Sequence, residues 1–179
     1  MKKYIALIIS LFILISCGSK KVTPEIFLIP SGYRGQVKVI FNEPCGQKEA
    51  YEGKKRLYII PESGVLITQF KQELGIINQE FYYVDAKGNR TPIPEMEMAD
   101  FNQDDSTKHF PNEPPRDKLG MFFGFTGGSE STGEKKYEFY GIYVGSFTEV
   151  MYSWMGNYSY EHAHDSLEFL QVKNCRSKK

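Results

Sequence analysis

Two of the three histidines of the chain stand two positions apart, in the segment Glu161-His162-Ala163-His164-Asp165. On a β-strand, alternate residues point to the same face, so His162 and His164 could bind one cation there. His109 offers a third imidazole from a distant segment, and the flanking carboxylates could orient the rings. This pattern predicts zinc or copper binding, or a metal-dependent enzyme, as one alternative function. A solvated polar loop is the competing interpretation, and no other cofactor is expected.

A second group of residues is aromatic and consists of Tyr152, Trp154, Tyr158 and Tyr160. Exposed rings on a rigid scaffold can stack on sugar faces or contact a peptide. Rings that pack into the core or a loop would give the same sequence pattern. The cluster therefore predicts a glycan- or peptide-binding module as a second alternative.

The third reactive group is the thiol of Cys17, which follows an apolar segment at the start of the chain. Lys2 and Lys3 precede an almost purely apolar run that ends at Ile15. The run is about a dozen residues long, whereas a bilayer-spanning helix needs roughly 20. Leu14-Ile15-Ser16-Cys17 is similar to the lipobox of bacterial lipoproteins, in which the bond before the Cys is cut and the thiol carries diacylglycerol. We expect a signal peptide at 1–16, a lipid-anchored tether at 17–24 and one domain at 25–179.

The residues after Cys17 indicate a location. Gly18 follows the Cys instead of Asp, which by analogy with lipoproteins favours the outer membrane, and an acidic export tag is absent. We therefore expect a lipid-anchored protein of the cell envelope that faces the periplasm. Its partners would be the membrane, through the lipid, and an envelope protein or glycan. The balance of 22 basic and 22 acidic residues excludes a strongly basic nucleic-acid-binding protein.

Lipidation of Cys17 would leave two cysteines, Cys45 and Cys175. An even pair outside the cytosol is more typical of a disulfide than of a metal site. Such a bridge would close a loop of about 130 residues and stabilise the fold by up to ~4–5 kcal/mol in the chain-entropy model.

Short β-type runs with turn residues between them dominate the rest of the chain. The Pro- and Asn-rich stretch 99–118 is predicted to be irregular. Ser146 and Glu149 form a capping box ahead of one short helix near residues 147–155. The segment Ser166–Val172 suits a helix capped by Asp165 and Glu168 or a strand with both faces buried, and we favour a terminal strand. Aromatics make up 15% of the residues and suit a thin core between two sheets. The sequence predicts a mainly β fold, an antiparallel β-sandwich or barrel-like single domain.

Three stretches carry a resemblance to a family of small bacterial lipoprotein domains of unknown function. The first is residues 27–39, which contain Pro30-Ser31-Gly32-Tyr33-Arg34-Gly35. The second is residues 57–66, which contain Tyr58-Ile59-Ile60-Pro61 and Gly64. The third is residues 81–88, which begin Phe81-Tyr82-Tyr83-Val84. The resemblance implies an extracytoplasmic, mainly β lipoprotein domain and brings no catalytic residue. The preferred interpretation is a lipid-anchored, non-catalytic binding or structural module of the cell envelope, and whether the protein has any enzymatic activity stays open.

Overall fold

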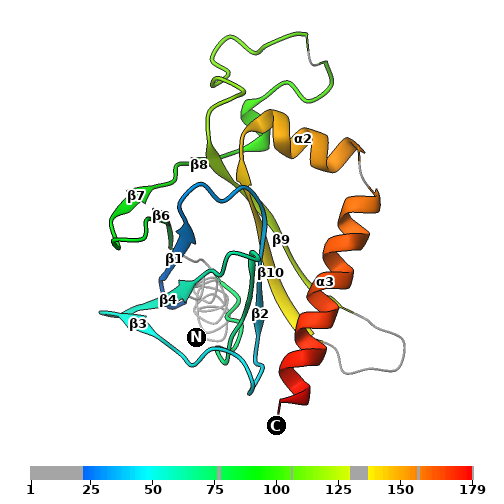
Figure 1. Cartoon of the computed structure of the whole chain (residues 1–179). Helices are drawn as coiled ribbons and strands as arrows, with labels where there is room; N and C mark the ends of the chain where they lie inside the picture. The colour runs from blue at the N-terminus through cyan, green and yellow to red at the C-terminus, as the bar shows by residue number, and fades with distance from the viewer. Residues whose placement is uncertain (1–21, 76–77, 106, 130–136, 157, 179) are drawn as a thin grey trace, which may run out of the picture.

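The computed structural model describes residues 22–75, 78–105, 107–129, 137–156 and 158–178, with the backbone alone described at 123–129 and 154–167. Two five-stranded sheets face each other, and two α-helices flank the second sheet (Figure 1). The prediction of a mainly β, sandwich-like single domain is confirmed. The described strands do not close into a barrel.

The first sheet has β1 (Glu25–Pro30) at its centre, and β1 runs parallel to both neighbours. Its strands lie in the order β3 (Tyr51–Glu52), β4 (Lys55–Ile59), β1, β6 (Gln79–Val84) and β7 (Arg90–Pro92). The edge strand β7 pairs antiparallel with β6 through the turn at residues 85–89.

The second sheet has β10 (Tyr137–Gly145) at its centre, antiparallel to both neighbours. Its strands lie in the order β5 (Val65–Ile67), β2 (Gly35–Phe41), β10, β9 (Gly120–Ser129) and β8 (Glu95–Met96). The edge strands β5 and β8 run parallel to β2 and β9.

Both sheets are mixed, whereas the sequence pattern predicted antiparallel pairing. The reason lies in the connections. The chain crosses between the sheets, so β1, β4 and β6 belong to one sheet, while β2 and β5, which lie between them in sequence, belong to the other. β1, β4 and β6 share one direction, and β2 and β5 share one direction, so these neighbours pair in parallel.

The core lies between the sheets and is aromatic, as predicted. The ring of Phe27 lies with its centroid 4.8 Å from the ring centroids of both Tyr58 and Phe81. The second sheet faces these rings with alternate residues, which include Val37 and Val39 of β2. Side chains of period two thus fill the cluster between the sheets, and two smaller buried clusters in the described part of the chain contain Val172 and Phe147.

A hydrogen-bonded group of polar side chains spans the two sheets within this core. The hydroxyl of Tyr58 donates to Glu25 over 2.9 Å, and Gln79 Nε2 donates to the other carboxylate oxygen over 2.8 Å. Tyr140 of the second sheet donates to Gln79 Oε1 over 3.1 Å. Burial raises the pKa of Glu25, and hydrogen bonds from Gln79 and Tyr58 partly offset that shift.

The helix α2 (Phe147–Gly156) confirms the predicted capping box. Ser146 N donates to Glu149 Oε2 over 2.7 Å, and Glu149 N donates to Ser146 Oγ over 3.3 Å. The ring of Phe147 stacks on Phe101, with centroids 4.2 Å apart, and thereby fixes α2 to the stretch that precedes β9.

The helix α3 (Tyr158–Ser177) shows that the strand predicted at Ser166–Val172 is wrong. Glu168 and Val172 are buried four residues apart, which is the spacing of a helix face, while Leu170 between them is 53% exposed. No helix among the described residues is long and apolar enough to cross a membrane.

One face of α3 is attached to the second sheet and to the loop after β2. Lys38 forms an ion pair with Glu168 in which both side chains are buried. Cys175 is bonded to Cys45 with a Cα–Cα distance of 5.6 Å, so the predicted disulfide is present. Arg176 donates from Nε to Glu43 over 2.9 Å and from a second guanidinium nitrogen to the other oxygen.

The buried ion pair leads to a stability prediction. Lys38→Met and Glu168→Leu should each lower the free energy of unfolding by about 3–5 kcal/mol, because each removes one member of this buried ion pair and leaves the other charge buried. The double variant should recover much of that loss, because neither charge of the pair is then buried. Urea unfolding of the three variants checks this. Losses that simply add in the double variant would contradict it.

Candidate functional site

The end of the sandwich where β1 turns into β2 brings together the three stretches that carry the resemblance. The Tyr33 hydroxyl donates to Gln36 O over 2.5 Å and lies directly above Gly64. Tyr83 in turn donates from its hydroxyl to Tyr33 O over 3.1 Å. Gly64 has φ of +75°, and an added Cβ would overlap the Tyr33 hydroxyl. These contacts fix the turn that presents Arg34.

Arg34 lies beside α2 and two tyrosines, and we call Arg34, Tyr83, Tyr143 and Glu149 the Arg34 cluster. Arg34 Nη1 donates to Glu149 Oε1 over 2.7 Å. The other oxygen of Glu149 accepts a hydrogen bond from the Ser146 amide in the capping box. A Cβ built on Gly145 would lie 2.8 Å from Tyr143 Cε1 and 2.9 Å from Glu149 Oε2, so the ring and the carboxylate are neighbours.

The contact between Arg34 and Glu149 favours the charged form of both side chains. Burial would raise the pKa of Glu149, but hydrogen bonds from Ser146 and Arg34 outweigh burial, and the pKa is lowered. The hydrogen bond to Glu149 raises the pKa of Arg34. Burial raises the pKa of Tyr83, and the Arg34 charge partly offsets this rise. At neutral pH the cluster therefore presents a cation, an anion and neutral phenols, which suits binding of a polar ligand.

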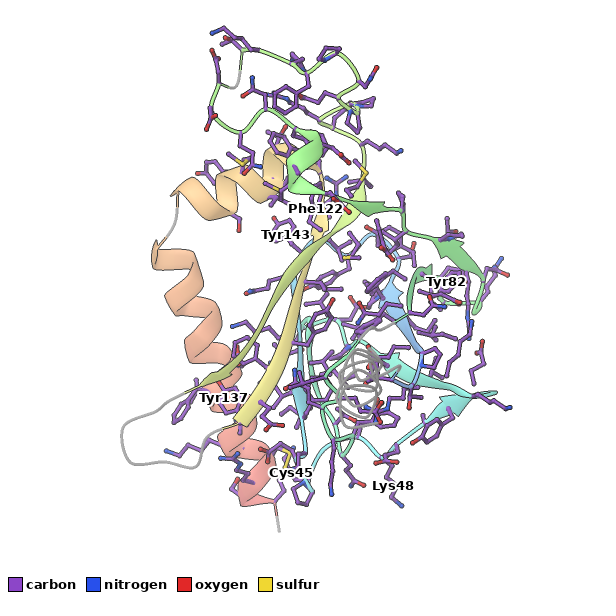
Figure 2. The ribbon with its side chains drawn as sticks, turned by 180° about the vertical axis from the view of Figure 1, so that it is seen from behind. Cys45, Lys48, Tyr82, Phe122, Tyr137 and Tyr143 are labelled. Carbon is purple, nitrogen blue, oxygen red and sulfur yellow. A yellow bond between two sulfur atoms is a disulfide. The ribbon has the colours of Figure 1, made fainter. Side chains whose placement is uncertain are left out.

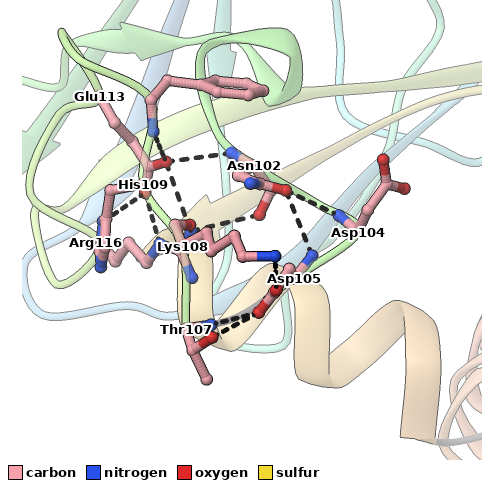
Figure 3. Close-up of polar contacts among 9 residues, drawn as sticks. Asn102, Asp104, Asp105, Thr107, Lys108, His109, Glu113 and Arg116 are labelled. Carbon is pink, nitrogen blue, oxygen red and sulfur yellow. Dashed lines mark hydrogen bonds and ion pairs between the residues drawn. The ribbon is translucent and has the colours of Figure 1, made fainter.

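The predicted irregular stretch 99–118 forms a loop above α2, at the same end of the sandwich (Figures 1 and 3). The Glu113 side chain, only 1% exposed, is its centre. It accepts hydrogen bonds from the backbone amides of Asn102 over 3.0 Å and Phe110 over 3.1 Å, and it forms an ion pair with Arg116. Arg116 also donates to Lys108 O over 2.8 Å. The Glu113 carboxylate thus ties together segments of the loop around residues 102, 110 and 116.

The predicted metal ligands are placed as follows. His109 lies on the exposed side of the loop, with Nδ1 3.0 Å from Glu113 Oε1. His162 and His164 lie on α3, where positions two apart differ by about 200° around the axis, so the expected strand geometry is wrong. Their side chains lie outside the described part. Among the side chains that are described, no three His, Cys, Asp or Glu groups are placed to hold a metal ion. Metal binding stays a prediction.

The predicted aromatic surface is described at one position. Tyr152 on α2 is 72% exposed. The side chains of Trp154, Tyr158 and Tyr160 lie outside the described part, as does Cys17. Glycan or peptide binding by these rings and lipidation at Cys17 therefore stay predictions.

The sequence interpretation did not single out Arg34 or Glu149 as functional residues. Arg34 was noted only as part of a turn signature, and Glu149 only as part of a capping box. Those signals explain the backbone around each residue. They do not indicate that the two side chains meet, because 115 residues separate them.

The contact between Tyr33 and Gly64 generates a prediction with a matched control. Gly64→Ala should destabilise the fold by more than the ~1–3 kcal/mol expected for a strained backbone, because the methyl group also meets Tyr33 and lies 2.7 Å from Gln36 O. Gly88→Ala has a similar φ of +84° with nothing within 4 Å, so it should show the backbone cost alone. Thermal unfolding of both variants checks this, and equal losses would contradict the proposed contact.

The loop generates a pH prediction. Hydrogen bonding to Arg116 lowers the pKa of Glu113 to about 2, from an ordinary value of 4.5. Because the folded pKa is the lower one, the ionised carboxylate stabilises the loop above pH 4.5, and this contribution is lost as the pH falls from 4.5 towards 2. An NMR titration of the Glu113 carboxyl carbon should show a midpoint near 2, and Arg116→Gln should move it upward. A wild-type midpoint near 4.5 would contradict the account.

Comparison with known proteins identifies one family and one related fold. The DUF6843 family of unknown function matches residues 21–149. No curated protein matches the chain. A crystal structure described as "Putative Lipoprotein from Bacillus anthracis" matches with a TM-score of 0.51 and 21% sequence identity, over 70% of this chain and 71% of that chain. Identity this low shows a shared fold alone.

The family match has a structural meaning. It begins shortly before β1 and ends at Glu149, so it includes the whole Arg34 cluster and the loop at 99–118. The helix α3, with His162 and His164, follows the matched residues. The match covers most of the chain, and the protein belongs to the DUF6843 family of unknown function.

Proposed function

We propose that the protein is a lipid-anchored lipoprotein of the bacterial cell envelope and acts as a non-catalytic binding module. The observation that carries this proposal is the segment Leu14-Ile15-Ser16-Cys17 after an apolar run that is too short to span a bilayer. Acylation at Cys17 with two or three chains would give stable attachment, whereas one chain holds a protein only marginally. The outer membrane, on its periplasmic side, is the proposed location because Gly18 follows the Cys.

The fold suits such an anchor. The strand β1 starts at Glu25, and Thr23 just before it is tied to Glu73 by a backbone amide hydrogen bond of 2.9 Å. The five residue-to-residue steps from Cys17 to Val22 can span at most about 18 Å. The end of the sandwich where β1 begins would therefore lie close to the membrane.

The binding surface in this proposal is the opposite end. There the connection from β1 to β2, the helix α2 and the loop at 99–118 lie at one end of the sandwich (Figure 1), and Arg34 contacts Glu149 of α2. Ordered loops on a rigid scaffold are where binding residues concentrate. The half-exposed Arg34 and the exposed Tyr152 supply a cation and an aromatic surface for a ligand.

Lipidation is tested at Cys17 in the native host. Mass spectrometry of the purified protein should find residues 1–16 removed and a diacylglyceryl thioether with a further acyl chain on Cys17. Cys17→Ala should move the protein from the membrane to the soluble fraction, because the acceptor sulfur is lost. Ser19→Ala is the control and should stay in the membrane fraction. An unmodified Cys17 in wild-type protein would overturn the proposal.

A further inference from the structure

Arg34 differs from the other arginines in how its guanidinium is used. The chain has five arginines, and four of them make two or more hydrogen bonds: Arg56, Arg90, Arg116 and Arg176. Within the described part of the chain, Arg34 makes one, from Nη1 to Glu149. A guanidinium carries five N–H donors in a plane, so a half-exposed group with one bond can still donate to a ligand.

The partner of Arg34 is held in place independently. Glu149 uses Oε1 for Arg34 and Oε2 for the Ser146 amide. If Arg34 turned to another acceptor, Glu149 would keep its place in the capping box. The Arg34–Glu149 pair is also exposed, with 49% and 36% of the two side chains accessible. An exposed pair of this kind contributes little to stability, so a ligand can compete for the guanidinium.

Two tyrosines lie near the Arg34–Glu149 pair. Tyr83 is tied by its hydroxyl to the carbonyl of Tyr33, which fixes its ring beside the turn. Tyr143 is packed against Gly145 next to the Glu149 carboxylate, and Figure 2 labels it on the second sheet. Tyr83 thus contacts the residue before Arg34, and Tyr143 lies next to the carboxylate that Arg34 binds. Rigid rings beside an arginine suit a ligand that carries an apolar or sugar face next to its charge.

We propose that the Arg34 cluster is a binding site for a carboxylate group carried by an envelope glycan or peptide, with Arg34 exchanging Glu149 for the ligand. The guanidinium fork matches a carboxylate or a phosphate. The nearby Glu149 charge disfavours a phosphomonoester, because it repels a dianion more strongly than a monoanionic carboxylate. The inference rests on the proposed envelope location only for the source of the ligand.

Paired probes test the inference on the full protein extracted from membranes in detergent. The sugar pair is a galacturonate trisaccharide and its neutral galactose analogue, and the peptide pair is acetyl-Ala-Ala with a free or an amidated C-terminus. The readout is the NMR shift of the backbone amides at positions 34 and 149, which every variant retains, and the affinity from its titration. Binding of the galacturonate probe but not its analogue supports a sugar acid, and binding of the free peptide but not the amide supports a peptide carboxylate. Equal binding within both pairs, or no binding, overturns the inference.

Variants assign the binding to the cluster. Arg34→Gln should weaken binding of the carboxylate probe at least tenfold, and Arg34→Lys several-fold, because lysine lacks the planar fork. Glu149→Gln should strengthen binding several-fold, because the competing charge is removed. Arg90→Gln is the matched control, an arginine paired with Glu52 on the first sheet, and should bind as wild type does. Wild-type affinity in Arg34→Gln would overturn the inference. If that variant does not fold, unchanged affinity in Glu149→Gln would do so.

The two proposals fail separately. An unmodified Cys17 together with Arg34-dependent binding would remove the lipoprotein proposal and leave the site. A lipidated Cys17 together with carboxylate binding that ignores Arg34 would leave the lipoprotein and remove the site.

Discussion

A tyrosine hydroxyl packed over a glycine closes one end of this sandwich, and the arrangement of that end depends on it. Tyr33 can reach Gln36 O only because residue 64 has no Cβ. The same closure brings Gly64 O within 2.9 Å of the Lys38 amide, which joins the turn after β4 to β2. Tyr83 then bonds to Tyr33 O, and Arg34 is directed towards α2. The candidate site is thus a consequence of how the turns pack.

The opposite end is held by different chemistry. There the disulfide between Cys45 and Cys175 and the pairing of Arg176 with Glu43 join α3 to the loop after β2. Further along α3, the buried pair of Lys38 and Glu168 anchors the helix on the sheet. A covalent bond and a buried ion pair make this end rigid, and the chain enters the domain there. In the proposed orientation, a rigid base lies near the membrane and polar loops lie away from it.

The sequence predicted the strands well, because period-two alternation such as Val37 and Val39 depends on local burial alone. It did not predict which sheet each strand joins, since that choice depends on connections that pass from one sheet to the other. The last segment failed for a related reason. Leu167, Phe169 and Val172 suit a strand or a helix, and the helix is decided by contacts of Glu168 and Cys175 with residues far away in sequence. The Arg34 cluster was not predicted because its two charged members are 115 residues apart.

The central claim is that the protein is anchored at the β1 end and binds at the other end. Its most direct test is paramagnetic broadening of amide NMR signals in the lipidated protein, reconstituted in nanodiscs that contain gadolinium-chelating lipid headgroups. The account predicts strong broadening at Thr23 and Glu73, and sharp signals at Arg34 and Glu149. Broadening of Arg34 and Glu149 with sharp signals at Thr23 and Glu73 would contradict it.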